Sequence, residues 1–336
     1  MSQSILVVGG AGYVGGHTSK ALARAGFLPV VLDDLSTGHR GFAQWGPLIV
    51  ADTHNSKAVE DAVRRYHCIA ALHFAACAYI GESVADPAKY YTNNVAGTLS
   101  LLAGMRAAGC NTLVFSSTCA VYGQPQQIPI VEATRPEPIN PYGASKLMAE
   151  RILADFRAAY GLRSIALRYF NACGADPDGD LGELRDPETH LIPRAMMALQ
   201  GYISDFAVFG SDFDTPDGTA VRDYIHVTDL ARAHVAALGL LLAGSPGGVF
   251  NLGTGRGFSV KEVLRAIECE TGQTVSGPIG PRRPGDPPVL IADPTLARAE
   301  LGFDPVYSDL GNIVRTAWAW HRRAHPKQAW LAPRGD

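Results

Sequence analysis

The residues with the clearest capacity for chemistry are a tyrosine and a lysine, Tyr142 and Lys146, four positions apart in the segment PYGASKLMAE. The segment predicts the start of a helix, and residues at positions i and i+4 lie on one face of a helix. An ammonium group beside a phenol stabilises the phenolate and so lowers the pKa of the tyrosine toward values useful for proton transfer. The alternative is a pair on a solvated helix face, so the pair needs support from other segments.

A third candidate is Thr118, which ends the apolar run TLVFSST. Such a run predicts a buried strand of a parallel sheet, and ligands bind such sheets at the carboxyl ends of their strands. There the Thr118 hydroxyl would hydrogen-bond the oxygen that loses or gains a proton. The alternative is a hydroxyl that only caps the local backbone.

A glycine-rich turn in VVGGAGYVGG places Gly9, Gly12 and Gly15 between an apolar run and a helical stretch, and Asp33 ends the next apolar run. Glycines there allow backbone N–H groups and the helix N-terminus to approach a pyrophosphate. Asp33 would accept hydrogen bonds from the ribose hydroxyls and would repel a 2′-phosphate, which favours NAD over NADP. The alternative is a turn that only packs a helix on a strand. Asp52, after the third apolar run, would reach the adenine amino group, or else is a solvated loop acid.

The elements that position these residues alternate between apolar runs and Ala/Leu-rich stretches. Expected strands lie in ILVVGG, LPVVLDD, AALHFAA, TLVFSS and SIALRYF, and expected helices at about 17–25, 56–66, 94–108 and 142–160. Continuous apolar strands separated by helices predict a parallel sheet that is covered on both faces. The fold class is therefore α/β, a doubly wound parallel (Rossmann) sheet.

Past Asn171 this rhythm weakens, and Gly, Pro and Asp gather in loops typical of a smaller mixed α/β lobe. A helix with Thr228 as its N-cap and a strand in VFNLGTG then return to the large lobe. The predicted division is 1–175 plus 222–252 for the dinucleotide-binding domain, and 176–221 plus 253–336 for the substrate-binding lobe.

The composition narrows the class of protein. Of the 336 residues, 47% are apolar and 18% charged, which is enough to bury a core, and the net charge of −3 argues against nucleic-acid or membrane-surface partners. No apolar stretch reaches the ~18 residues of a membrane span, and the N-terminus lacks the features of a secretory signal. Six scattered cysteines without CxxC spacing predict free thiols in the cytoplasm and no metal site.

Several strings together carry a resemblance to a known family. They are GGAGYVGGH, HFAACAYIGESV, YYTNNVAGT, VFSSTCAVYG, NPYGASK, LRYFNACGA, HLIP, DGTAVRDYIHVTDLA, NLGTG and PRRPGDPP. The chain closely resembles the extended short-chain dehydrogenase/reductases and, within them, the UDP-galactose 4-epimerase (UDP-glucose 4-epimerase) family over nearly its whole length.

The resemblance implies a tightly held NAD, Tyr142 as catalytic base and acid, Lys146 on the nicotinamide ribose, and Thr118 in the Ser/Thr role. The cofactor-binding positions that it implies are Gly9, Gly12, Tyr13, Val14, Gly15, Asp33, Asp34, Asp52, Thr53, Phe74, Ala75, Ala76, Asn94, Ser116, Tyr142, Lys146 and Tyr169. The UDP-sugar positions are Thr118, Asn171, His190, Leu191, Val208, Phe209, Arg222, Arg283, Asp286 and Leu290. Guanidinium groups suit a diphosphate, although Arg222 and Arg283 could instead pair with nearby Asp223 or Asp286.

The implied reaction interconverts UDP-glucose and UDP-galactose by transient oxidation at the sugar C4, rotation of the 4-keto sugar and hydride return. An N-acetylglucosamine or pentose epimerase is the alternative. Cys119 and Ala120 follow Thr118 where dehydratase and decarboxylase relatives carry an acid, which disfavours those branches. A non-catalytic NAD-binding regulator is disfavoured because Tyr142 and Lys146 are both present.

Three positions depart from the family pattern. Asp34 stands where Asn is common, Ala78 where some members have Lys, and Leu290 where some have Tyr. We therefore expect Leu290 to face the sugar and to leave room for slow turnover of an N-acetyl sugar. The expected assembly is a homodimer through the helices near Asn94 and Tyr142, which carry the apolar or small residues Leu99, Leu102, Ala103, Leu147 and Ile152.

Overall fold

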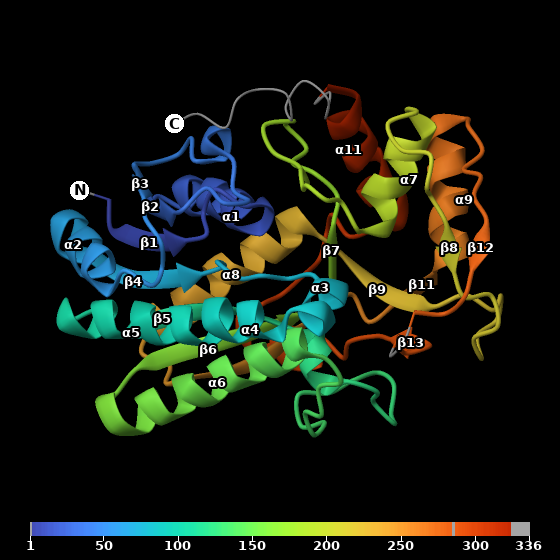
Figure 1. Ribbon diagram of the computed structural model, residues 1–336. Coiled ribbons are helices and arrows are strands. Elements are labelled where there is room, and N and C mark those ends of the chain that lie inside the picture. Colours follow the sequence, from blue (N-terminus) through green and yellow to red (C-terminus); the bar gives the residue numbers. More distant parts are fainter. Residues whose placement is uncertain (1, 284–285, 324–336) are drawn as a thin grey trace.

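The computed structural model describes residues 2–283 and 286–323. Its main sheet has seven strands in the order β10-β6-β5-β4-β1-β2-β3, and every neighbouring pair is parallel (Figure 1). The strands are β1 (Ser4–Val8), β2 (Leu28–Asp33), β3 (Leu48–Val50), β4 (Cys68–His73), β5 (Thr112–Thr118), β6 (Arg163–Tyr169) and β10 (Gly247–Leu252). The order reverses between β1 and β4, where a doubly wound sheet opens a crevice for a ligand.

Helices cover both faces of this sheet, and each face has its own apolar core. On one face α1, α8 and α10 pack over β1, β4, β5 and β6, and on the other α2, α5 and α6 do so. The helices are α1 (Tyr13–Arg24), α2 (Ser56–Tyr66), α5 (Gly97–Ala107), α6 (Pro141–Tyr160), α8 (Val227–Leu242) and α10 (Thr295–Leu301). The predicted doubly wound α/β fold is confirmed.

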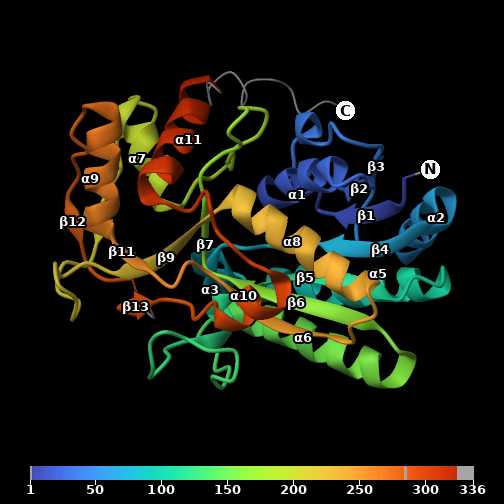
Figure 2. The ribbon, with the colours of Figure 1, turned by 180° about the vertical axis from the view of Figure 1, so that it is seen from behind.

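A smaller layer lies beside the carboxyl ends of the main strands (Figures 1 and 2). Its central strand β9 pairs with β7, β11 and β13, while β8 pairs with β12. The elements are β7 (Asn171–Cys173), β8 (Val208–Phe209), β9 (Val221–His226), β11 (Gly257–Ser259), β12 (Ile279–Gly280), β13 (Val289–Leu290), α7 (Leu191–Leu199), α9 (Val260–Thr271) and α11 (Leu310–Arg323). Helices α7, α9 and α11 share one apolar core with β7, β8, β9 and β11.

Two short helices and a π-helical turn precede α5. They are α3 (Ile80–Ala85), α4 (Pro87–Tyr90) and the π-turn Tyr91–Ala96. Short 3-10 turns occur at Arg40–Phe42 and Cys119–Tyr122. Among the described residues, no helix combines the length and apolar character that crossing a bilayer requires.

Two details differ from the sequence expectations. The N-cap of α8 is His226, whose Nδ1 accepts a hydrogen bond from Thr228 N at 3.0 Å, so the predicted Thr228 cap is wrong. Thr228 cannot be the N-cap because the helix begins at Val227, so that Thr228 is already its second residue. Residues 222–226, assigned to the dinucleotide-binding domain, form most of strand β9, which among the described strands pairs only in the smaller sheet. Residues 324–336 of the predicted substrate lobe lie outside the described residues.

Candidate active site

The glycine turn between β1 and α1 lies against the carboxyl end of β4. Gly9 has a φ of +78°, and a Cβ at this position would lie 2.4 Å from Ala75 N. A Cβ at Gly15 would lie 2.2 Å from Gly9 O. Both positions therefore require glycine, and the N-terminus of α1 stays open to an anion at the point where the strand order reverses.

Asp33 closes the far side of this turn. Its Oδ2 accepts a hydrogen bond from Ala11 N and its Oδ1 one from Leu35 N, both at 2.9 Å. The side chain is buried, and this burial raises the pKa of the carboxyl despite the two donors. Each carboxylate oxygen keeps a second lone pair for a ligand hydroxyl, which suits an unphosphorylated ribose.

These residues open on one cleft of about 800 Å³. Fifteen of the predicted cofactor positions line it: Gly9, Gly12, Tyr13, Val14, Gly15, Asp33, Asp34, Thr53, Phe74, Ala75, Ala76, Ser116, Tyr142, Lys146 and Tyr169. The volume, the N–H-rich turn and the buried acid fit a dinucleotide.

Two predicted cofactor positions, Asp52 and Asn94, are not among the described residues that line the cleft. Asp52 is exposed, and its Oδ1 accepts hydrogen bonds from His54 N at 2.8 Å and from the His54 ring at 2.7 Å. Asn94 is 3% exposed and lies behind the cleft wall. Its amide bonds to both backbone groups of Cys77 and donates to Ser145 Oγ at 2.9 Å. Asn94 thus braces the helix that carries Tyr142 and Lys146.

Helix α6 and strand β5 bring the three predicted catalytic residues together. Asn140 caps α6 through Gly143 N at 2.8 Å, and a Cβ at Gly143 would lie 2.5 Å from Ala120 O. This close approach sets the first turn of α6 against the end of β5. Lys146 Nζ donates to Ser116 O at 2.9 Å and lies 4.8 Å from the centre of the Phe115 ring.

Thr118 makes both the backbone-capping contact and a contact with the predicted proton carrier, Tyr142. Its Oγ1 accepts a hydrogen bond from Ala120 N at 3.1 Å, which is the capping contact. The hydroxyl also interacts with the Tyr142 phenol and lowers the pKa of that group. Since a hydroxyl has one donor hydrogen and two acceptor lone pairs, both contacts are compatible.

Lys146 is not among the groups that most affect the pKa of Tyr142. Burial dominates and raises the pKa of Tyr142, with Thr118 and Arg185 acting against it. Burial likewise lowers the pKa of Lys146 to about 8, since the low dielectric disfavours the ammonium ion. The Lys146 ammonium donates its hydrogen bond to the Ser116 carbonyl and not to the Tyr142 phenol.

The predicted diphosphate-binding residues lie on the smaller layer, outside the described lining of the cleft. Arg222 on β9 forms an ion pair with Asp286, which was the alternative to phosphate binding. The guanidinium of Arg283 lies 4.5 Å from the centre of the Phe209 ring, and burial lowers the pKa of Arg283. Asn171 is on β7.

The remaining predicted substrate positions divide into two groups. Leu191 is the first residue of α7. The preceding residue, His190, lies 2.8 Å from Glu188 Oε1 through its Nδ1. The carboxylates of Glu183 and Glu188 raise the pKa of His190 against the effect of burial. Val208 and Leu290 are each 9% exposed and belong to apolar clusters. Leu290 packs in the cluster of Val121, Tyr122, Ile130, Phe170 and Ala292, so the expectation that it faces the sugar is not supported.

Sequence reasoning missed a wall of the cleft formed by the segment between β7 and α7. Its residues Leu184, Arg185, Asp186 and Pro187 line the cleft, as does Tyr79. The segment is rich in Gly, Pro and Asp without a periodic pattern, so no spacing in the sequence predicts that it lines the cleft. His39 bonds to Leu184 O at 2.9 Å and so joins this wall to the loop after β2, which also lines the cleft.

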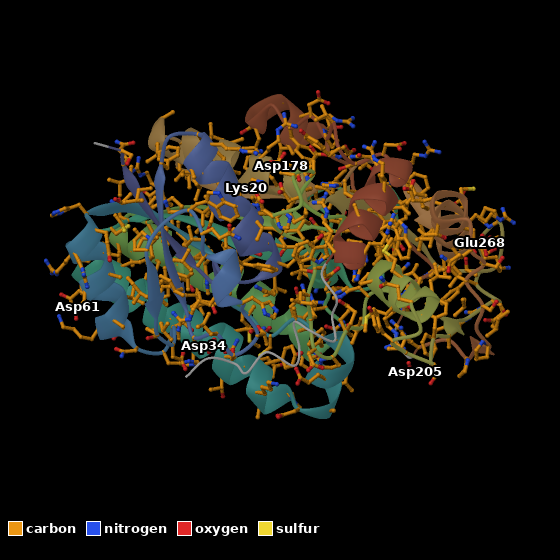
Figure 3. All side chains as sticks on the ribbon, turned by 90° about the horizontal axis from the view of Figure 1, so that it is seen from above. Lys20, Asp34, Asp61, Asp178, Asp205 and Glu268 are labelled. Carbon is orange, nitrogen blue, oxygen red and sulfur yellow. The ribbon has the colours of Figure 1, made fainter. Side chains whose placement is uncertain are left out.

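Two acidic groups in this segment have ligand atoms close enough for a metal ion: Asp176 with Asp178 and Asp180, and Glu183 with Glu188 and His190. Each already holds a side-chain cation. Lys20 of α1 lies 2.5, 2.8 and 2.7 Å from the three aspartates (Figure 3). Arg185 Nε lies 2.9 Å from Glu183 Oε1. The six cysteines all lie in the described part of the chain and are unpaired there.

Comparisons with known proteins agree with this geometry. The model of the NAD dependent epimerase/dehydratase family matches residues 5–253. A UDP-glucose 4-epimerase of Rhizobium leguminosarum bv. trifolii is 50% identical over 323 residues, which cover 96% of this chain and 98% of the relative.

Solved structures extend the similarity to the fold. A UDP-glucose 4-epimerase of Brucella ovis in complex with NAD is 54% identical with a TM-score of 0.93, covering 95% of this chain and 98% of that one. A UDP-glucose 4-epimerase of Stenotrophomonas maltophila with bound NAD and formylated UDP-arabinopyranose is 36% identical with a TM-score of 0.93, covering 97% and 100%. The chain therefore belongs to the NAD dependent epimerase/dehydratase family, in its UDP-glucose 4-epimerase branch.

Proposed function

We propose that this protein interconverts UDP-glucose and UDP-galactose with NAD as its resident cofactor. The observation that carries the proposal is the convergence of the glycine turn, Asp33, Tyr142 and Lys146 on a single cleft. When bound, NAD supplies the acceptor for a hydride from the sugar C4 and the donor that returns it. The positions that would hold NAD in the cleft come from the carboxyl ends of the strands β1 to β6 and the turns that follow them, from the start of α1, and from α6.

The chain's own residues handle the proton. Tyr142 would take the proton of the 4′-hydroxyl as C4 is oxidised from an alcohol to a ketone. It would return the proton after the 4-keto sugar has turned. Thr118 would hydrogen-bond the same oxygen through its hydroxyl, and Lys146 would bind the nicotinamide ribose. Burial raises the pKa of Tyr142, so the phenol would need a nearby positive charge, which the nicotinamide ring of NAD would supply when bound, to act as a base.

The smaller layer would bind UDP and leave the sugar loosely held. Arg222, Arg283, Asn171, His190, Leu191, Phe209 and Asp286 are the proposed contacts. Firm binding of the diphosphate and weak binding of the sugar allow the 4-keto sugar to turn without release. On this proposal residues 1–175 and 222–252 form the NAD-binding domain, from which Asn171 and Arg222 reach UDP, and residues 176–221 and 253–336 form the UDP-sugar-binding lobe.

The second candidate is a 4-epimerase for UDP-N-acetylglucosamine or a UDP-pentose. The relative of Stenotrophomonas maltophila, whose structure holds a formylated UDP-arabinopyranose, favours a test of the pentose. An acid-dependent dehydratase remains disfavoured because Cys119 and Ala120 follow Thr118.

We also propose that the protein is a cytoplasmic homodimer. Large apolar side chains are exposed on the neighbouring elements α3, the π-turn, α5 and α6. They are Ile80 at 51%, Val84 at 65%, Tyr91 at 37%, Leu99 at 42% and Met148 at 46%. Exposed apolar side chains on neighbouring elements suit a self-complementary interface. The unpaired cysteines suit a reducing compartment.

The test is incubation of the purified protein, without added NAD, with UDP-galactose, UDP-N-acetylgalactosamine and UDP-arabinopyranose, followed by separation of the products. UDP-glucose formed from UDP-galactose, with NAD retained by the protein, supports the proposal. A requirement for added NAD in proportion to product would instead indicate a dehydrogenase. Turnover of only the N-acetyl sugar or the pentose would favour the second candidate. A monomeric mass by light scattering would contradict the homodimer.

A further inference from the structure

A buried ion pair behind the active site has no part in the mechanism above. Glu150 lies on α6, four positions after Lys146 and eight after Tyr142, so each side chain of this series lies on the same side of the helix as the one before it. The Oε2 of Glu150 accepts a hydrogen bond from Arg168 Nη2 at 2.5 Å, and its Oε1 accepts one from Arg168 Nε at 3.0 Å. The two side chains are 7% and 6% exposed.

The end of strand β5 binds this series of side chains at three successive residues. Ser116 O accepts a hydrogen bond from Lys146 Nζ at 2.9 Å, and Ser117 Oγ donates one to Glu150 Oε1 at 2.5 Å. The next residue of the strand, Thr118, interacts with the phenol at the start of the series. Of the three helix residues, Glu150 is the one outside the described lining of the cleft. It is therefore placed to hold the helix and not to touch a ligand.

The partners of Glu150 stand side by side in the sheet. Ser117 of β5 pairs in register with Arg168 of β6, and Arg168 pairs in register with Asn251 of β10. Arg168 Nη1 donates to Tyr122 OH at 2.9 Å, and Tyr122 OH donates to Asn251 Oδ1 at 2.7 Å. Ser117 and Asn251 are fully buried. These five residues form a polar cluster in which every side chain has a hydrogen-bond partner.

The polar cluster interrupts an apolar layer. Two positions earlier on the same three strands, and so on the same face of the sheet, lie Phe115, Ala166 and Val249, which pack in the core beneath α6. Apolar packing has no preferred direction, so by itself it sets the rotation of a helix only loosely. A guanidinium and a carboxylate meet in a fixed forked geometry. The polar cluster therefore fixes how α6 is turned and how far along the sheet it lies.

The position of α6 decides where the two reacting side chains point. Tyr142 and Lys146 precede Glu150 by about 12 and 6 Å along the helix axis, within one continuous run of helix. A rotation or shift at Glu150 is therefore passed on to both side chains. A misplacement of about 1 Å at reacting groups costs about a hundredfold in rate.

We propose that Glu150 is a positioning residue for the epimerase reaction, and that its bonds to Ser117 and Arg168 hold α6 where Tyr142 and Lys146 face the cleft. This inference rests on the proposed function. Burial of an ion pair costs desolvation energy that apolar side chains avoid, so stability alone does not require this pair. Positioning of the catalytic helix accounts for it.

The first test replaces the ion pair by apolar side chains in the double variant Glu150→Met/Arg168→Met. Such a replacement is often neutral for stability, so we expect the Tm to stay within about 3 °C of wild type. The kcat for UDP-galactose should fall about 10- to 100-fold, with the KM within about twofold and the NAD content unchanged. A kcat within about twofold of wild type would show a merely structural pair and would overturn the proposal.

A milder variant and a control accompany the double variant. Ser117→Ala removes one bond of Glu150 and keeps the ion pair, and it is the substitute if the double variant does not fold. We expect its kcat to fall about 3- to 10-fold at an unchanged KM. Glu60→Gln removes an exposed ion pair on α2, in which Glu60 Oε1 lies 2.8 Å from Arg64 Nε, and should keep the wild-type kcat. A lower Tm with full kcat in Ser117→Ala would overturn the proposal.

Hydrogen exchange of the NAD-loaded protein gives a readout that does not depend on turnover. We expect the amides of residues 140–150 to exchange about tenfold faster in the double variant, while those of α8, on the other face of the sheet, keep their wild-type rate. If the wild type does not epimerise UDP-galactose, the proposed function fails, and the exchange rates still decide whether the pair holds α6. Unchanged exchange in 140–150, or an equal rise in α6 and α8, would overturn the inference.

Discussion

The Lys146 ammonium lies 2.9 Å from the carbonyl oxygen of Ser116, and this hydrogen bond joins helix α6 to the carboxyl end of strand β5. Lys146 is 3% exposed, so the bond holds a positive charge inside the protein next to the cleft. The hydroxyl of the same Ser116 lies 2.7 Å from the Tyr169 hydroxyl, which ties β5 to β6. These two hydrogen bonds therefore hold α6, β5 and β6 together where they line the cleft.

The buried charge of Lys146 predicts a pH dependence of stability. Burial lowers the pKa of Lys146 from 10.5 to about 8, so the native state releases its proton before the unfolded state does. Between these values the unfolded state binds more protons, and the free energy of unfolding rises with pH, by up to about 3 kcal/mol. Lys146→Met should remove this rise, measured as urea midpoints from pH 7 to 10.5. Lys57→Met, on the exposed face of α2, is the control. Parallel curves for wild type and Lys146→Met would contradict the buried charge.

Gly15→Ala tests the close approach at the turn. Its Cβ would lie 2.2 Å from Gly9 O, so the backbone must shift, at a cost of about 1–3 kcal/mol of stability and with much weaker NAD retention. Gly239→Ala is a matched helical glycine, since a Cβ there meets nothing within 4 Å. That variant should keep NAD and gain up to about 1 kcal/mol. Equal retention of NAD by both variants would show that the turn does not hold the cofactor.

Leu290→Tyr tests whether this position gates the sugar pocket. Since Leu290 is 9% exposed among apolar side chains, a tyrosine should overpack the cluster and cost about 1–3 kcal/mol. We expect turnover of UDP-galactose and of UDP-N-acetylgalactosamine to fall by similar factors, together with the Tm. Leu290→Met, of similar volume, should change little. Selective loss of the N-acetyl activity would restore Leu290 as the gate.

Much of this arrangement could be predicted from the sequence because it depends on local rules. Apolar runs separated by helices predict the sheet, and the glycine turn followed by Asp33 predicts the cofactor end of the cleft. The pattern predicts a helix at about 56–66, and the observed helix is Ser56–Tyr66, where Asn55 is the N-cap and His67 the C-cap.

The remainder depends on contacts between distant segments. Asn94 supports Ser145, 51 residues further along the chain, from a π-turn, and no spacing in the sequence predicts this contact. Asp52 instead bonds locally to His54, two positions further on. Leu290 lies beside Arg222 because β13 pairs with β9, which sets the side of the strand that its side chain occupies. Arg185 reaches the cleft only because an irregular segment folds back over it.

The central claim is that Tyr142 carries the proton in an NAD-dependent 4-epimerisation. The most direct measurement compares Tyr142→Phe with wild type for conversion of UDP-galactose to UDP-glucose without added NAD, alongside the NAD content of each protein. Phenylalanine keeps the ring that packs against Tyr90 and removes only the hydroxyl. We predict wild-type conversion to an equilibrium mixture, and a rate about 10²–10⁴-fold lower in the variant with NAD still bound. A variant rate within tenfold of wild type at equal NAD content would contradict the account.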